Sequence, residues 1–162
     1  PVPHDPDDFD GAGDRAYNAG PDALLVNFKA LSFDFVPDPD AGVARIVPTP
    51  QLAGMKLQPT VRGTNGNCGD WRAALQGDVS NPLAPVFRGS YPLACGTRSW
   101  HVNALDPGPY FAAVFRALWE QGGGSWVGGV REGTLPAGAR LLAARDSRPR
   151  AEVIRDLNKF SN

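Results

Sequence analysis

The sequence has few of the residues and runs on which several kinds of function depend. Its two histidines, His4 and His101, lie in distant segments, and its two cysteines form no CxxC pair, which argues against a zinc site. No apolar run approaches the ~18 residues that would cross a bilayer. The net charge is −1, and no lysine/arginine block reaches the density of a nucleic-acid-binding surface. We therefore expect no membrane span, no nucleic-acid partner, no metal and no other cofactor.

Elements of common hydrolases and phosphate sites are also missing. No G-x-S-x-G element is present, so a local Ser-His-Asp triad is not expected. Paired carboxylates such as Asp38 and Asp40 flank prolines, where aspartate usually caps turns. The triglycine 122–124 follows an expected helix instead of opening one, which is the wrong polarity for phosphate binding. A small hydrolase in its own right is the least favoured interpretation.

Glycine and proline are plentiful, at 19 and 16 of 162 residues, and this excess favours short strands and turns. Residues 1–22 are acidic and poor in apolar residues, and they predict an extended arm that begins at Pro1 without a methionine, as in a mature or truncated product. Residues 23–105 predict an antiparallel β-rich region, because apolar and polar residues alternate within it. Its expected strands are 26–35, 43–48, 57–61, 71–77, 86–91 and 98–105, and the first two are expected to form a hairpin through a turn at 37–42.

A helix is expected after Asp106, a suitable N-cap, with an apolar stripe that includes Phe111 and Phe115. Strands are predicted at 126–130 and 140–144, so 106–146 reads as a helix packed on strands. A last helix is expected from about 149 to 160, within the segment 147–162. The fold class is therefore predicted to be α+β: a β-rich antiparallel meander followed by a helix-on-sheet unit and a C-terminal helix.

Two further residue types bear on function. Cys68 and Cys95 lie in polar, glycine-rich turns, and we expect them to form a disulfide, which implies an oxidising compartment. The four tryptophans could line a sugar-binding surface, but tryptophan in strands and on a helix face is more often a core residue, and we expect a core role. They are Trp71, Trp100, Trp119 and Trp126.

Several stretches, in order, resemble one bacterial family. They are residues 21–28 (PDALLVNF), 106–112 (DPGPYFA) followed by a glycine-rich turn and 126–130 (WVGGV), and 153–162 (VIRDLNKFSN). They resemble the class C low-molecular-mass penicillin-binding proteins, which are D-alanyl-D-alanine carboxypeptidase/endopeptidases. The resemblance covers most of the chain from about residue 17, and the last ten residues are its most specific part. The two cysteines also resemble a disulfide found in the family.

The resemblance implies a serine-type enzyme that acts on peptidoglycan stem peptides through an acyl-serine intermediate and binds β-lactams. Such enzymes combine Ser-x-x-Lys, S-x-N and Lys-Thr-Gly elements. Here Ser161 matches the first position of S-x-N and is the one candidate catalytic residue, with Asn162 in the middle position. No serine is followed three positions later by lysine, and no Lys-Thr-Gly occurs.

We therefore expect a fragment: the accessory region of a periplasmic enzyme, with residues 147–162 re-entering a penicillin-binding domain that is missing here. This chain alone is expected to be inactive, and cell-wall synthesis proteins are further candidate partners. The alternative is a standalone secreted β-rich module that binds glycan or protein through exposed aromatics. An open reading frame that continues past Asn162 to a Lys-Thr-Gly element would favour the fragment, and a stop codon there would favour the module.

Overall fold

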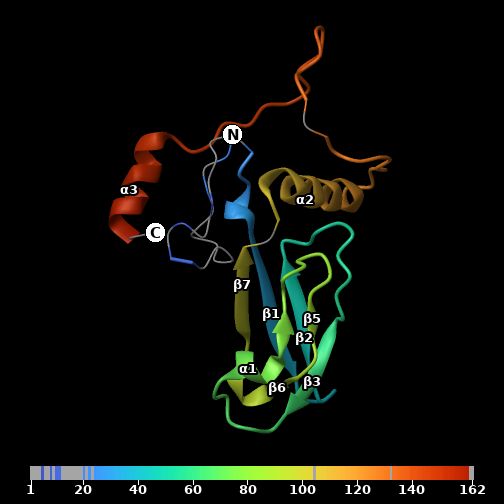
Figure 1. Ribbon diagram of the computed structural model, residues 1–162, viewed down its shortest axis with the longest axis vertical. Helices are drawn as coiled ribbons and strands as arrows, with labels where there is room; N and C mark the ends of the chain where they lie inside the picture. Colours follow the sequence, from blue (N-terminus) through green and yellow to red (C-terminus); the bar gives the residue numbers. More distant parts are fainter. Residues whose placement is uncertain are drawn as a thin grey trace. The chain divides into compact units, whose positions relative to one another are not determined.

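The computed structural model describes residues 5, 8, 10, 11, 20, 22, 24–103, 105–131 and 133–160. The chain divides into two compact units, Pro1–Arg131 and Glu132–Asn162. The first unit holds the strands and two helices, and the second holds one helix (Figure 1). In chain order the elements are η3 (Asn27–Lys29), β1 (Ala30–Asp38), β2 (Val43–Thr49), β3 (Thr60–Thr64), α1 (Trp71–Leu75), β4 (Gly77–Asp78), β5 (Val86–Phe87), β6 (Ser90–Pro92), η4 (Leu93–Cys95), β7 (Arg98–Asn103), α2 (Pro107–Gln121) and α3 (Arg150–Phe160).

A five-stranded sheet in the order β6-β3-β2-β1-β7 forms the body of the first unit. The predicted hairpin is present: β1 and β2 pair antiparallel with Phe35 opposite Ile46, and Gly42, at φ 66°, helps close the turn between them. β1 also pairs antiparallel with β7. The β3–β6 pair is parallel, whereas the sequence predicted a purely antiparallel arrangement, and β4 and β5 form a separate short ladder. The α+β class is confirmed.

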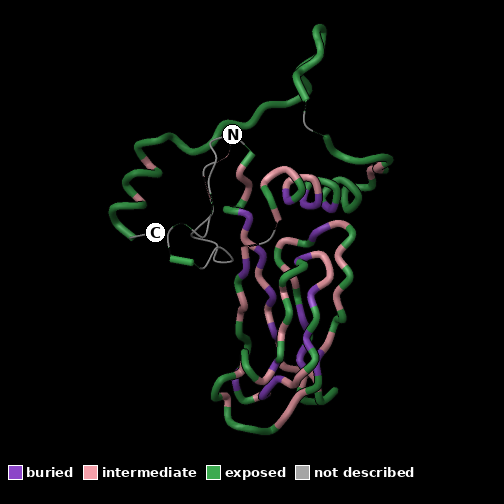
Figure 2. Tube along the Cα trace, viewed as in Figure 1, coloured by how far each residue is buried: buried purple, intermediate pink, exposed green. Residues whose placement is uncertain are grey.

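Alternation along β1 places the core on one face of the sheet. Leu31, Phe33 and Phe35 are fully buried while the residues between them are partly exposed, as period-2 patterning requires (Figure 2). Phe35 lies at the centre of an aromatic cluster, with its ring stacked on Tyr91 at 5.6 Å and edge-on to Phe87 at 5.1 Å. This cluster gives the sheet a continuous apolar interior.

Residues 71–75 form the short helix α1, so the predicted strand there is wrong. The Asp70 carboxylate accepts a hydrogen bond from the backbone N–H of Ala73 at 3.1 Å, which caps the first turn. Gln76 ends the helix in the left-handed conformation. The N-cap aspartate, which accepts from the N–H three residues later, therefore outweighed the strand-like composition of the segment.

The strands predicted at 126–130 and 140–144 are also wrong, because both segments are irregular in the structure. Both segments are largely exposed (Figure 2), and Val127 and Leu142 are 97% and 82% exposed, so their apolar residues are not buried as those of a sheet strand would be. Each segment also has a glycine nearby at positive φ, Gly128 and Gly138, which interrupts extended backbone.

Helix α2 runs across the end of the sheet at which β1 begins (Figure 1). It starts at Pro107 after Asp106, as predicted, although the Asp106 side chain makes no capping hydrogen bond. The Tyr110 hydroxyl donates to the Ala30 carbonyl at 2.7 Å, and the Ala113 carbonyl accepts from the Ala53 N–H at 3.0 Å. These bonds fix α2 to β1 and to the loop that follows β2.

Helix α3 is the regular element of the second unit and confirms the helix predicted at 149–160. None of its residues is buried. None of the helices in the described part of the chain combines the length and the apolar character that crossing a bilayer requires.

Candidate functional site

The predicted catalytic residue, Ser161, lies outside the described residues. The description ends at Phe160, the last residue of α3. The guanidinium of Arg148, which lies just before α3, pairs with Asp156 and lies 3.5 Å from Glu152, both residues of the helix. The hydrogen bond to Asp156 raises the pKa of Arg148, so this exposed arginine keeps its charge. These contacts stabilise the helix and supply no acid or base.

The disulfide expected from the sequence is present between Cys68 and Cys95. It joins the loop after β3 to the η4 turn after β6, which are 27 positions apart in the chain. Cys95 is buried in the core, and Cys68 packs against the same core. The bridge therefore holds the parallel edge of the sheet, where the ladder is short.

Two of the four tryptophans support the core, as expected. Trp71 and Trp100 are partly buried and meet edge-on, with ring centroids 6.4 Å apart. The Arg72 guanidinium lies over both rings, at 5.4 and 5.5 Å, in a cation–π arrangement.

The other two tryptophans belong to a partly exposed aromatic ladder, formed by Phe111, Phe115 and Trp119 of α2 and by Trp126 of the segment that follows the helix. Phe111 and Phe115 are stacked with centroids 5.6 Å apart and planes 21° from parallel. Phe115 and Trp119 continue the stack at 6.2 Å and 15°, and Trp126 meets Phe115 edge-on at 5.8 Å. The first three residues are four positions apart, so they share one side of the helix.

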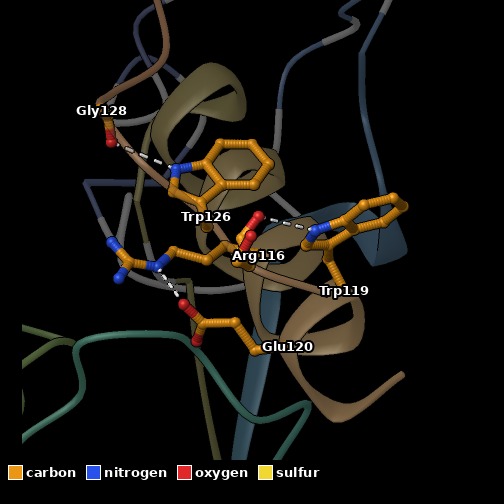
Figure 3. Close-up of polar contacts among 6 residues, drawn as sticks. Arg116, Trp119, Glu120, Trp126 and Gly128 are labelled. Carbon is orange, nitrogen blue, oxygen red and sulfur yellow. Dashed lines mark hydrogen bonds and ion pairs between the residues drawn. The ribbon is translucent and has the colours of Figure 1, made fainter. Parts of the chain in front are cut away.

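The segment that follows α2 holds the tryptophans of the ladder in place. The Trp119 indole N–H donates to the Ser125 carbonyl at 3.0 Å, and the Trp126 indole N–H donates to the Gly128 carbonyl at 3.2 Å (Figure 3). A Cβ on Gly124 would lie 2.2 Å from the Trp119 Nε1, so only glycine lets the chain turn this closely over the indole.

Polar side chains border the ladder on the same helix. Arg116 donates through Nε to the Glu120 carboxylate at 2.8 Å, an i,i+4 pair in which both side chains are exposed (Figure 3). Gln121 donates its amide N–H to the Gln51 side-chain oxygen at 3.0 Å. The arrangement combines aromatic faces with neutralised charges and amides, which suits binding better than acid–base catalysis.

Other candidate sites in the described part of the chain carry less chemistry. A pocket of about 220 Å³ is lined by Pro48, Gln51, Leu52, Met55 and Leu57, and its one polar side chain is Gln51. No group of histidine, cysteine, aspartate or glutamate side chains among the described residues is arranged to hold a metal ion.

Sequence reasoning missed the ladder because it took the apolar stripe of α2 as core. The buried face of α2 is instead Tyr110, Ala113, Val114 and Ala117, and Phe115 and Trp119 face solvent, 42% and 50% exposed. The core expectation is therefore wrong for Trp119. The signal that could have revealed the ladder is the i, i+4, i+8 spacing of aromatic residues at 111, 115 and 119.

The Cys68–Cys95 disulfide is compatible with an exported protein, because disulfides form and persist in oxidising compartments. The model of the D-Ala-D-Ala carboxypeptidase 3 (S13) family matches residues 4–162. The chain therefore belongs to this carboxypeptidase family, which confirms the resemblance drawn from its sequence stretches. No curated protein matches the sequence.

Proposed function

We propose that this chain is the accessory region of a serine-type D-Ala-D-Ala carboxypeptidase/endopeptidase that acts on peptidoglycan stem peptides through an acyl-serine intermediate. The observation that supports this proposal most strongly combines the family match with two missing catalytic motifs. The family match runs from residue 4 to residue 162, yet the sequence contains neither a Ser-x-x-Lys nor a Lys-Thr-Gly element. In this proposal the reactive serine belongs to parts of the parent enzyme outside these residues.

The chemistry of acyl transfer explains why the chain alone is expected to be inactive. A serine nucleophile needs a neighbouring base to take its proton, and the tetrahedral intermediate needs oriented donors. The three lysines, Lys29, Lys56 and Lys159, stand in neither motif. We propose that Ser161 begins the S-x-N element of the parent enzyme, where it would assist proton transfer and hold substrate, and that α3 delivers it.

The disulfide supports a periplasmic location for the parent enzyme, because such bonds persist in oxidising compartments. Peptidoglycan stem peptides and β-lactams are its proposed ligands, and cell-wall synthesis proteins are candidate partners.

Labelling with a fluorescent penicillin tests this function. We expect the 162-residue chain to give no labelled band on a denaturing gel, and the product of the complete gene to give one. A labelled band from the chain alone would contradict the proposed inactivity. A complete gene product without Lys-Thr-Gly, or without labelling, would contradict the assignment to an acyl-serine enzyme.

A standalone secreted binding module is the second candidate, and the exposed aromatic ladder is the observation that favours it. Reading the gene separates the two candidates. A coding sequence that stops after Asn162 supports the module, and one that continues into the penicillin-binding motifs supports the accessory region.

A further inference from the structure

The aromatic ladder has the form of a stacking surface. Its centroid separations of 5.6 and 6.2 Å, with nearly parallel planes, correspond to rings that are displaced sideways from one another. Displaced rings leave part of each face open, and Phe115 and Trp119 are 42% and 50% exposed. The faces of aromatic rings carry negative charge density, which attracts weakly positive C–H groups.

The ladder is also preorganised, unlike a loose group of surface aromatics. Both indole N–H groups already donate to backbone carbonyls of the segment 125–128, and Trp119 packs against the Gly124 backbone. A ligand therefore meets aromatic carbon whose orientation is fixed before binding, and little side-chain entropy is lost on association.

The charges beside the ladder indicate what kind of ligand fits. Arg116 and Glu120 neutralise each other at 2.8 Å, so the border offers hydrogen bonds without net charge. Arg116 is the basic residue of α2 and is paired with Glu120, so this helix offers a nucleic acid or an acidic peptide little attraction. An uncharged ring with C–H faces and hydroxyl or acetamido groups on its edge would satisfy both the rings and the border, and a pyranose has this chemistry.

We propose that the aromatic ladder binds the glycan strand of peptidoglycan by stacking its amino-sugar rings on Phe115 and Trp119. The identity of the polymer rests on the proposed function, because a peptidase that trims stem peptides works beside the glycan to which they are attached. The ladder would then hold a strand while the catalytic domain of the parent enzyme acts on its peptides.

Titration of the 162-residue chain with a β-1,4-linked N-acetylglucosamine hexasaccharide, followed by tryptophan fluorescence, tests the proposal. We expect saturable binding, and Trp119→Ala is expected to raise the Kd about tenfold, the equivalent of about 1.4 kcal/mol for one aromatic contact. Trp119→Phe keeps a ring and is expected to stay within about threefold of the original Kd. Phe160→Ala removes an exposed aromatic residue of α3 and serves as the matched control, with no change expected. Far-UV circular dichroism confirms that each variant is folded.

Sedimentation with purified sacculi, intact and stripped of stem peptides, identifies the part of peptidoglycan that is bound. Binding to both forms supports the proposal. Binding only to intact sacculi, or only to free stem peptides, overturns it. A lack of binding to both forms of sacculi also overturns it, and so does a Kd for the hexasaccharide that is unchanged in Trp119→Ala. Self-association that Trp119→Ala abolishes would also overturn it, because the surface would then be an interface between copies. Penicillin labelling of the complete gene product is independent of these outcomes, so failure of the glycan proposal and failure of the enzymatic assignment are distinguishable.

Discussion

Replacing Phe35 by alanine should remove the central contact of the core. Phe35 is fully buried on β1 and its ring touches those of Tyr91, Phe87 and Trp71, with centroids 5.6, 5.1 and 5.7 Å away. Burial of a phenylalanine side chain stabilises a fold by about 2–3 kcal/mol, and each ring pair adds about 0.5–1.5 kcal/mol. These terms overlap, and they place the loss in the range of about 3–5 kcal/mol that Phe→Ala substitutions show.

Urea unfolding of the oxidised protein, followed by tryptophan fluorescence, measures this loss, because Trp71 reports directly on the environment of Phe35. The matched control is Phe28→Ala, since Phe28 is 67% exposed. We expect that control to change the free energy of unfolding by less than about 0.5 kcal/mol. A loss below about 1.5 kcal/mol for Phe35→Ala, or one no larger than that of the control, would refute the aromatic cluster as the centre of the core.

Two further pairs of substitutions in the first unit have expected outcomes. A Cβ at Gly89 would lie 1.8 Å from the Ala74 carbonyl oxygen, so Gly89→Ala should lower the free energy of unfolding by about 3 kcal/mol in the same urea assay. Gly108 lies in the first turn of α2 with open space around its Cβ, so the control Gly108→Ala should raise the free energy of unfolding by about 0.5 kcal/mol. Equal effects of the two substitutions would contradict the packing around Gly89. Burial raises the pKa of Tyr91 and of Tyr110 above the usual 10.0, so the folded state keeps these phenols protonated longer than the unfolded chain does. The stability that these protonated phenols contribute should therefore be complete below about pH 10 and be lost as the pH rises further. Tyr91→Phe and Tyr110→Phe should each reduce that alkaline loss in pH-dependent urea titrations. An unchanged slope of the unfolding free energy against pH in both variants would contradict the burial of these hydroxyls.

The support of the aromatic ladder bears on its proposed role as a binding surface. Its rings stand on a helix whose other face is fixed by the Tyr110–Ala30 and Ala113–Ala53 hydrogen bonds, so they are presented on a rigid support. In the proposed function, a rigid aromatic surface beside the sheet would give the parent enzyme a means of positioning its polymeric substrate that is separate from its chemistry.

Local patterns predicted much of the fold. Alternation from Leu31 to Phe35 predicted β1, the turn at 37–42 predicted its hairpin with β2, and the helical stripes predicted α2 and α3. The strand predicted at 71–77 failed because an aspartate cap favours a helix there. The strands predicted at 126–130 and 140–144 failed because an apolar run forms a strand only where a sheet can pair with it.

The sequence by itself determined the α+β class, the partnership of Cys68 and Cys95 and the family, because period, turn residues and motif order are local properties of the chain. Only the tertiary structure decided which side of α2 is buried. Two apolar sides compete on that helix, and the side with Tyr110, Ala113 and Ala117 is the buried one, because hydrogen bonds from Tyr110 to Ala30 and from Ala53 to Ala113 hold it against the core. The larger aromatic residues Phe115 and Trp119 therefore remain exposed to solvent, where they form the candidate site.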